Sequence, residues 1–322
     1  MPTTDASATP PPSAPPYVAF SVSRILTIAS NTLVELTRQK VFYTLLVFGL
    51  VIIATAGFFA QFTFEREEVA AAQIKFVKDF GLAAISIFGA VLAIVGTAQL
   101  LPAEIDNRTL YTILAKPVRR LEFLLGKYVG VVFLLAISVV IMSLLYFVVL
   151  DFKARAVIAE ESAESIRIGQ HADEVNARAA QLWAEAHDLA LAKAVLLLFM
   201  KMALLGAMAL FFSTFSTSMI FTVVVTTCLY FIGHLQVGAQ ESVKSEGGAY
   251  LSHFFMIVVT WIVPNLQAFN IADDINEGKI IPWMQMGQSG LPTGVMPVVV
   301  YGLLYITFLI WFAHIIFEEK EI

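Results

Sequence analysis

The segment best suited to recognition chemistry is a short basic stretch, Pro102–Lys127, between two apolar blocks. An acidic residue, Glu104, stands near its start. Its basic residues are Arg108, Lys116, Arg119, Arg120 and Lys127. Short basic loops of membrane proteins face the cytoplasm. We therefore expect this segment on the cytoplasmic side.

The middle of this segment has the pattern of a short helix. Thr109–Ala115 contains neither Gly nor Pro and can form about two helical turns before Pro117 ends them. Leu110 and Leu114 are four residues apart and share one face. They could fill a groove on a partner protein, while the basic pair after Pro117 orients that partner through acidic surface charges. The alternative is that the basic residues only set membrane orientation and bind anionic headgroups.

A second candidate is a charged residue inside an apolar block. Lys201 lies near the middle of Leu189–Phe212, where insertion scales give a charged lysine a cost of about 2.5–3.5 kcal/mol. One hypothesis is that Lys201 faces a subunit interface or an aqueous path. The alternative is that the span is offset and the side chain reaches toward headgroups. We favour the functional hypothesis.

Signatures of catalysis are missing from the sequence. The phosphate-cradling pattern G-x-x-x-x-G-K-[ST] is absent, because Tyr128 follows Gly126-Lys127 and no glycine stands five residues earlier. Neither H-E-x-x-H nor G-x-S-x-G occurs. We therefore expect no enzymatic activity and no cofactor in this chain.

Metal ligands are also sparse. The single cysteine, Cys228, cannot form a Cys-based metal site alone. His253, Met284 and Met286 could present soft and borderline ligands, but methionine in membrane proteins is more often apolar filler. We expect no bound metal.

The composition indicates a membrane protein. Of the 322 residues, 58% are hydrophobic and 14% charged, with a mean hydropathy of +0.79. Soluble domains carry about 25% charged residues. Six apolar blocks approach the ~20 residues that a helix needs to cross a bilayer: Val41–Ala60, Phe80–Leu101, Tyr128–Leu150, Leu189–Phe212, Ile220–Val237 and Val295–Phe317. We predict an all-α integral membrane protein in contact with the lipid bilayer. A net charge of -5 argues against nucleic-acid binding.

The chain before the first span divides into two parts. Residues 1–20 are rich in Pro, Ala, Ser and Thr and predict a disordered cytoplasmic tail, followed by a single transmembrane domain over 21–322. Ser21–Lys40 carries apolar residues on one helical face, which predicts an amphipathic helix lying in the membrane interface. The alternative is a cytosolic extension of span one.

Two long acidic loops, 151–188 and 239–294, are expected outside, with both termini cytoplasmic. The first has apolar residues at helical spacing, which predicts an outer helix leading into span four. Within the second, Tyr250–Val263 is too short to cross and ends at Pro264, which predicts a re-entrant or interfacial segment. If it does cross, the C-terminus changes sides.

The basic segment resembles the cytoplasmic loop between spans two and three of type 2 ABC exporter permeases. The matching residues are Glu104, Arg108, Thr109, Leu110, Leu114, Pro117, Arg119, Arg120, Phe123, Gly126 and Lys127. The six-span plan also resembles that family, and the most similar branch is linked to maturation of multicopper enzymes and nitrous oxide reductase. The longer outer loop 151–188 departs from its best-known members.

This resemblance implies a role and partners. It implies an exporter of two permease chains, identical or paralogous, and two ABC ATPase subunits, in the cell's inner (plasma) membrane. ATP and Mg²⁺ would bind the ATPases, which would push on the 104–127 loop. A non-transporting mechanotransmission subunit would share that loop. An ion-driven transporter would instead need acidic residues or broken helices at the midplane, and the central spans contain no Asp or Glu.

Overall fold

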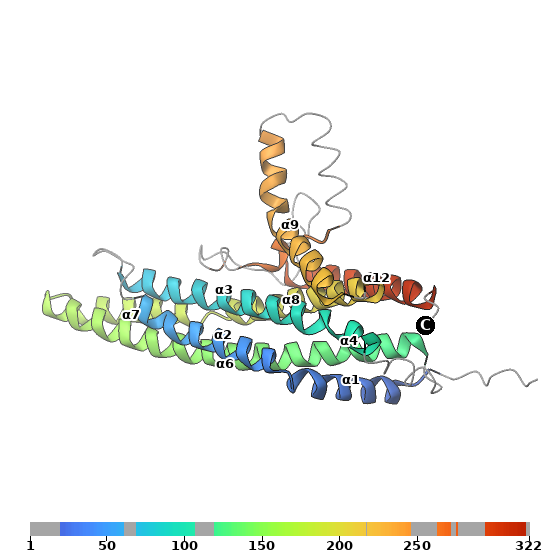
Figure 1. The fold of residues 1–322 in the computed structure, drawn as a ribbon. Coiled ribbons are helices and arrows are strands. Elements are labelled where there is room, and N and C mark those ends of the chain that lie inside the picture. Colours follow the sequence, from blue (N-terminus) through green and yellow to red (C-terminus); the bar gives the residue numbers. More distant parts are fainter. Residues whose placement is uncertain are drawn as a thin grey trace, which may run out of the picture.

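The computed structural model describes residues 20–60, 69–106, 119–216, 218–245, 263–271, 275 and 294–319. In these ranges the chain is helical apart from short connections, and no strand occurs (Figure 1). The helices are α1 (Val22–Thr37), α2 (Lys40–Phe59), α3 (Val69–Ala98), α4 (Leu100–Asp106), α6 (Arg120–Arg167), α7 (Ala172–Ala186), α8 (Ala190–Phe215), α9 (Met219–Ser245), the short 3-10 helix η1 (Gln267–Phe269) and α12 (Val295–Glu319).

Six described stretches are long and apolar enough to cross a membrane. They are Lys40–Phe59, Ala70–Glu104, Arg120–Arg167, Ala172–Phe215, Met219–Gln236 and Val295–Glu318. To within one residue, each coincides with or encloses one of the six predicted blocks. The predicted all-α, six-span membrane fold is therefore confirmed.

Helix α8 is the centre of the bundle and packs against α3, α6, α9 and α12. Its inner residues are mostly Ala, Leu, Met and Gly, and nearly all are buried. Small side chains let helices approach closely in lipid, where no hydrophobic effect drives them together. At one such contact, Gly89 of α3 lies against the Met202 side chain of α8.

Helices α1 and α2 follow α6 in the same direction, one after the other. Along α6, Gly126 and Gly130 lie against Ile28 and Thr32 of α1. Further on, Gly49 of α2 lies against Met142 of α6. A Cβ atom on Gly130 would be 2.7 Å from Thr32 Cβ and 2.8 Å from the Ala29 carbonyl oxygen, so glycine permits this approach. This arrangement favours the alternative expectation, in which the first helix extends span one, and a position in the membrane interface stays a prediction.

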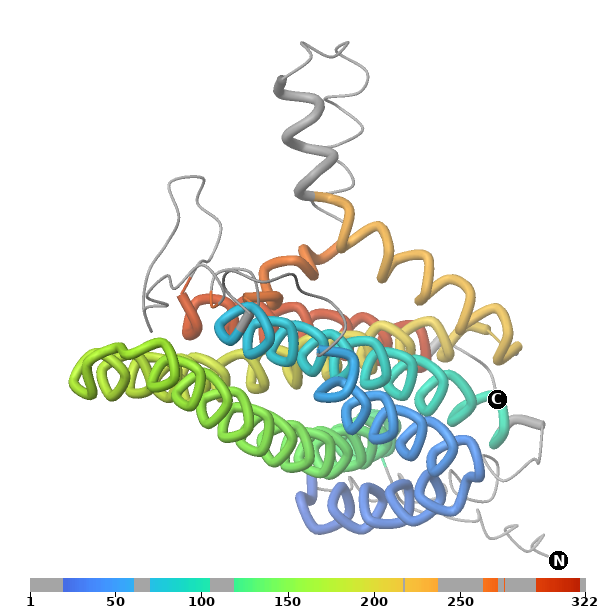
Figure 2. The backbone as a smooth tube through the Cα atoms, turned by 90° about the vertical axis from the view of Figure 1, so that its left-hand side faces the viewer, coloured from blue at the N-terminus to red at the C-terminus, as the bar shows by residue number. Residues whose placement is uncertain are grey.

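Helix α6 continues past its apolar block, Tyr128–Leu150, and its last part forms a hairpin with α7 (Figure 2). This hairpin occupies the predicted outer loop 151–188, and α7 is the predicted outer helix. His187–Leu189 forms a short break before α8. The start of α1 and the end of α12 lie at the opposite end of the bundle from this hairpin (Figure 1).

The residues after the expected re-entrant segment have irregular backbone inside the helical bundle. Val263–Ile271 contacts α8 and α9 through η1 and its flanks, and Leu266 and Phe269 are fully buried. The Leu266 N–H donates to the carbonyl of Gly233 on α9 at 3.1 Å. Irregular backbone at membrane depth is tolerated where protein surrounds it. Residues 250–262 themselves lie outside the described part.

Candidate functional site

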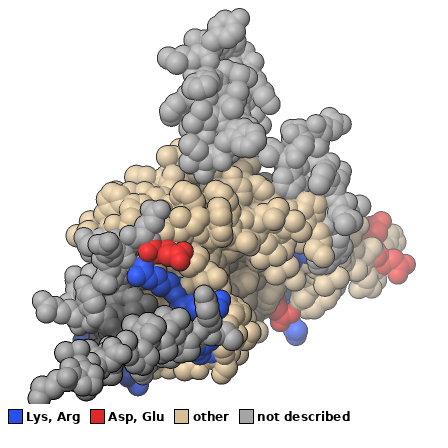
Figure 3. All heavy atoms as spheres, turned by 90° about the vertical axis from the view of Figure 1, so that its right-hand side faces the viewer, with Lys and Arg blue, Asp and Glu red and all other residues tan. Residues whose placement is uncertain are grey.

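The start of α6 is the meeting point of four helices: α1, α4, α6 and α12. The connection from α4 to α6, which carries most of the predicted docking residues, leaves and re-enters the described chain here. Figure 3 looks at this end and shows acidic and basic side chains side by side on a mostly uncharged surface. We call five of its charged residues the end cluster: Arg24, Glu35, Glu104, Glu122 and Lys127.

Lys127 is the centre of the end cluster. Only 2% of its side chain is exposed, and its Nζ atom lies 2.5 Å from Glu104 Oε1 and 3.1 Å from Glu35 Oε2. The ammonium also lies 5.9 Å from the centre of the Phe123 ring, within the range of a cation–π contact. A buried charge is stable only when it is paired. Lys127 therefore ties α4 and α1 to the start of α6.

Glu122 is a second buried anchor, with a side chain that is fully buried. Its carboxylate accepts hydrogen bonds from the Ser21 backbone N–H at 2.7 Å and the Arg24 guanidinium at 3.1 Å. It also accepts one from the Arg119 backbone N–H at 3.3 Å, just before α6 begins. The first N–H groups of a helix need such acceptors. Glu122 thus fixes the beginnings of both α1 and α6.

Helix α12 joins the same end through its last turn. The Arg120 guanidinium donates to the carbonyls of Phe317 and Glu318, both at 2.8 Å. The last carbonyls of a helix have no partner within the helix, so this contact satisfies them. The rings of Phe123 and Phe317 stack with their centres 6.1 Å apart. Both described ends of the chain therefore attach to the first turns of α6.

The predicted docking residues separate into three groups. Glu104, Phe123, Gly126 and Lys127 are buried and contact their own chain, and Glu104 and Lys127 are brought together. Arg119 is exposed and Arg120 is half-buried. Arg108, Thr109, Leu110, Leu114 and Pro117 lie outside the described residues. Their docking role stays a prediction.

Sequence reasoning missed three members of the end cluster, Arg24, Glu35 and Glu122. Two signals could have found them. Arg24 and Glu35 are about three helical turns apart and so lie on one side of α1. Glu122 stands at the third position of α6, where an acidic side chain caps the helix start.

The arrangement suits mechanical work better than chemistry. Buried ion pairs and close glycine contacts hold α1, α4 and α6 as one block, and Arg120 adds α12. A force applied to the connection between α4 and α6 would reach all four helices. The described residues contain no group of three or more His, Cys, Asp or Glu side chains placed to hold a metal ion. The possible ligands His253, Met284 and Met286 lie outside the described part.

Lys201 is inside the bundle, with 1% of its surface exposed. Its Nζ atom donates to Ser86 Oγ of α3 at 2.5 Å. The side chain therefore reaches neither the headgroup region nor the outer face of the bundle. The structure places it at a contact between two helices of its own chain.

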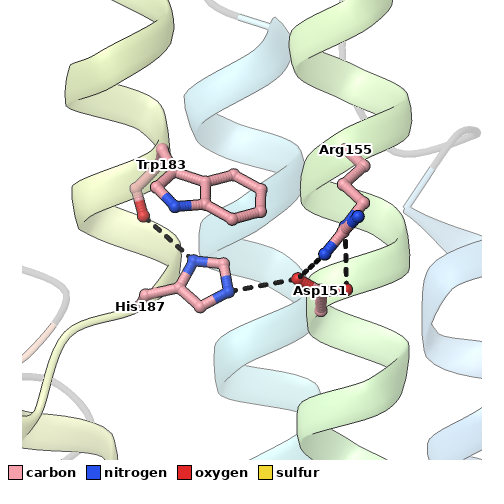
Figure 4. Close-up of polar contacts among 4 residues, drawn as sticks. All are labelled: Asp151, Arg155, Trp183 and His187. Atoms are coloured by element: carbon pink, nitrogen blue, oxygen red, sulfur yellow. Dashed lines mark hydrogen bonds and ion pairs between the residues drawn. The ribbon is translucent and has the colours of Figure 1, made fainter.

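A different polar cluster joins the α6–α7 hairpin to the bundle (Figure 4). The Asp151 carboxylate accepts from the Arg155 guanidinium at 2.9 and 3.3 Å, and His187 Nε2 lies 3.2 Å from it. Arg155 also lies over the Trp183 ring, and the Trp183 and His187 rings are 4.2 Å apart. A groove of about 550 Å³ adjoins Asp151 and His187. All four side chains are partly exposed, so this cluster is a surface contact.

Comparison with known families gives one match. Residues 33–162 match the model of the ABC-2 family transporter protein. The matched region runs from late α1 to late α6 and includes four members of the end cluster, all except Arg24. Comparison with curated proteins gives no match. The family match supports a membrane permease of an ABC transporter.

Proposed function

We propose that this chain is the permease subunit of an ATP-driven exporter, and that a separate ABC ATPase docks on the 104–127 loop. The observation that carries this proposal is the Lys127 contact with Glu104, which clamps together the two ends of the connection. The contact thus holds the two helices that flank the connection together as one base. A docked ATPase could move such a base as a unit.

The family match and the charge pattern support the remaining parts of the proposal. ABC permeases work with ATPase subunits, so ATP and Mg²⁺ would bind the partner. Two permease chains would form the membrane unit of the transporter, in the plasma membrane. The end of the bundle that carries the end cluster and the basic 102–127 segment would face the cytoplasm under the positive-inside rule. The hairpin would then face outside.

One observation favours a second candidate, a mechanotransmission subunit that moves no cargo itself. Helix α6 runs without a break for 48 residues, from the end cluster into the outer hairpin. At ~1.5 Å per residue such a helix is about 70 Å long, more than twice the ~30 Å hydrocarbon core. A continuous rod can pass movement across the membrane. Both candidates require the same ATPase docking.

The docking proposal is tested by removing apolar contacts while keeping every charge. The Leu110→Ser/Leu114→Ser double variant should insert normally and lose co-purification of its co-expressed ATPase. The matched control is Arg119→Gln/Arg120→Gln, which removes two charges and keeps both leucines. It should reduce ATPase recovery less than the leucine variant does. The difference should be clearest at high salt, which screens charges. Recovery of the ATPase at wild-type yield with the leucine variant would show that the docking assignment is wrong.

A further inference from the structure

A polar hub lies in the middle of the helical bundle, around Lys201 of α8. It is separate from the end cluster, which lies on α1, α4 and α6. Lys201 of α8 donates to Ser86 of α3, and Ser86 also shares a side-chain hydrogen bond with Tyr230 of α9. His234, one turn beyond Tyr230, lies within electrostatic reach of Lys201. Its ring centre is 4.4 Å from that of Tyr230. Three helices therefore contribute polar groups to one place.

The hub lies beside the irregular segment 263–271. Gly233, the neighbour of His234, has room for the Pro264 carbonyl, and its own carbonyl accepts from Leu266. Met200, the neighbour of Lys201, lies with Phe269 around Gly302 of α12. Non-helical backbone at membrane depth marks binding sites in transporters, because it lines cavities instead of lipid. The fold thus brings an interrupted backbone and a charged side chain to the same depth.

The charge of Lys201 has no acidic counterpart in the described part of the chain. Its described hydrogen bond goes to a neutral hydroxyl, and no described carboxylate forms an ion pair with it. An ammonium buried in a membrane protein is costly unless an opposite charge compensates it. The end cluster shows the contrast, because Lys127 is equally buried there and contacts two carboxylates. The lysine in the hub therefore has a hydroxyl partner but no described carboxylate partner.

The neighbours of Lys201 have the chemistry to bind an anion. Hydroxyl and imidazole groups can donate hydrogen bonds to an oxyanion. Ser86, Tyr230 and His234 are each half-buried, whereas Lys201 is fully buried. The charged group of the hub is therefore more deeply buried than its neutral polar groups, which lie on α3 and α9.

We propose that Lys201, Ser86, Tyr230 and His234 form a binding site for an oxyanion, the carboxylate or phosphate group of the cargo. Lys201 supplies the charge and the other three supply hydrogen bonds. The identification of the ligand as cargo rests on the proposed function. Binding of the oxyanion itself does not.

The first test measures the local charge with a cysteine introduced in place of Ser86. In a Cys228→Ala background, purified full-length Ser86→Cys chain in lipid nanodiscs is treated with an anionic or a cationic methanethiosulfonate reagent. The site predicts that the anionic-to-cationic rate ratio falls about tenfold on adding Lys201→Met, and that Lys201→Arg keeps it. An unchanged ratio in Lys201→Met, or no labelling of the introduced cysteine by either reagent, would overturn the site.

The second test measures binding and needs no change at Lys201. Inorganic phosphate and dioleoyl phosphatidate in the nanodisc are each tested for protection of the introduced cysteine from the anionic reagent. Protection by phosphate identifies a free oxyanion, and protection by phosphatidate alone identifies a lipid-borne one. Protection by neither contradicts the proposal. Because no ATPase is present, a failure of ATPase docking leaves both results unaffected.

Discussion

The two ends of α6 hold charges in opposite ways. At its start, Glu122 and Lys127 are buried and their ion-pair partners come from α1 and α4. At its hairpin end, the pair of Arg155 with Asp151 and the pair of Arg167 with Glu164 are exposed and lie within α6 itself. One helix therefore carries structural charges at one end and surface charges at the other.

This difference indicates where the molecule must be rigid. Exposed ion pairs contribute roughly 0–1 kcal/mol and leave their side chains free to rearrange. Breaking a buried pair costs about 3–5 kcal/mol, because it leaves a charge without compensation. The start of α6 is thus held in one geometry, as the proposed docking of an ATPase would require.

The largest effect is expected from breaking the buried end. Lys127→Met removes the ammonium that two carboxylates share and leaves buried Glu104 beside an apolar side chain. We expect a loss of about 3–5 kcal/mol in the free energy of unfolding. The measurement is denaturant or thermal unfolding of the purified chain in one detergent.

The matched change at the other end is Asp151→Asn, which breaks an ion pair of the exposed cluster. It should lower the free energy of unfolding far less than Lys127→Met does, because solvent screens an exposed ion pair. Equal losses in the two variants would remove the distinction between the ends of α6.

A smaller effect is expected from the glycine contact between α1 and α6. In Gly130→Ala the new methyl group meets Thr32 and the Ala29 backbone, so α1 must shift and stability falls by about 1–3 kcal/mol. Gly96→Ala in α3 is the control, because a Cβ atom there meets nothing within 4 Å. That control should be neutral or stabilising, since alanine favours a helix by about 0.5–1 kcal/mol over glycine. A Gly130→Ala chain as stable as the control would show that α1 is not closely packed.

Much of the fold could be predicted from the sequence, because lipid imposes a simple rule. Each span must be a long apolar helix, so all six spans were found from their apolar blocks. The outer helix α7 was found from its 3.6-residue periodicity. The placement of α1 was harder to predict. An amphipathic pattern specifies a buried face but does not specify whether protein or membrane covers it.

The candidate site could be predicted only in part. Glu104 and Lys127, at the ends of the basic segment, could be predicted as site residues because the segment resembles a known loop. Glu35 and Glu122, which form ion pairs with Lys127 and Arg24, could not be predicted. Their partners lie about one hundred positions away in the sequence. Lys201 was found as a costly charge in a span. Its neighbours Ser86 and Tyr230 are ordinary residues in apolar blocks, and only the packing of α3, α8 and α9 brings them to it.

The most direct test of the account places a photo-crosslinking residue at each end of the molecule. Benzoylphenylalanine at Leu110 or Leu114 probes the connection between α4 and α6, and the same residue at the exposed Ile166 probes the hairpin. The chain is co-expressed with its ATPase, and adducts are identified after irradiation of intact cells. We predict a permease–ATPase adduct from positions 110 and 114 and none from position 166. An ATPase adduct from position 166, or none from 110 and 114, would contradict the assignment of the basic end as the docking site.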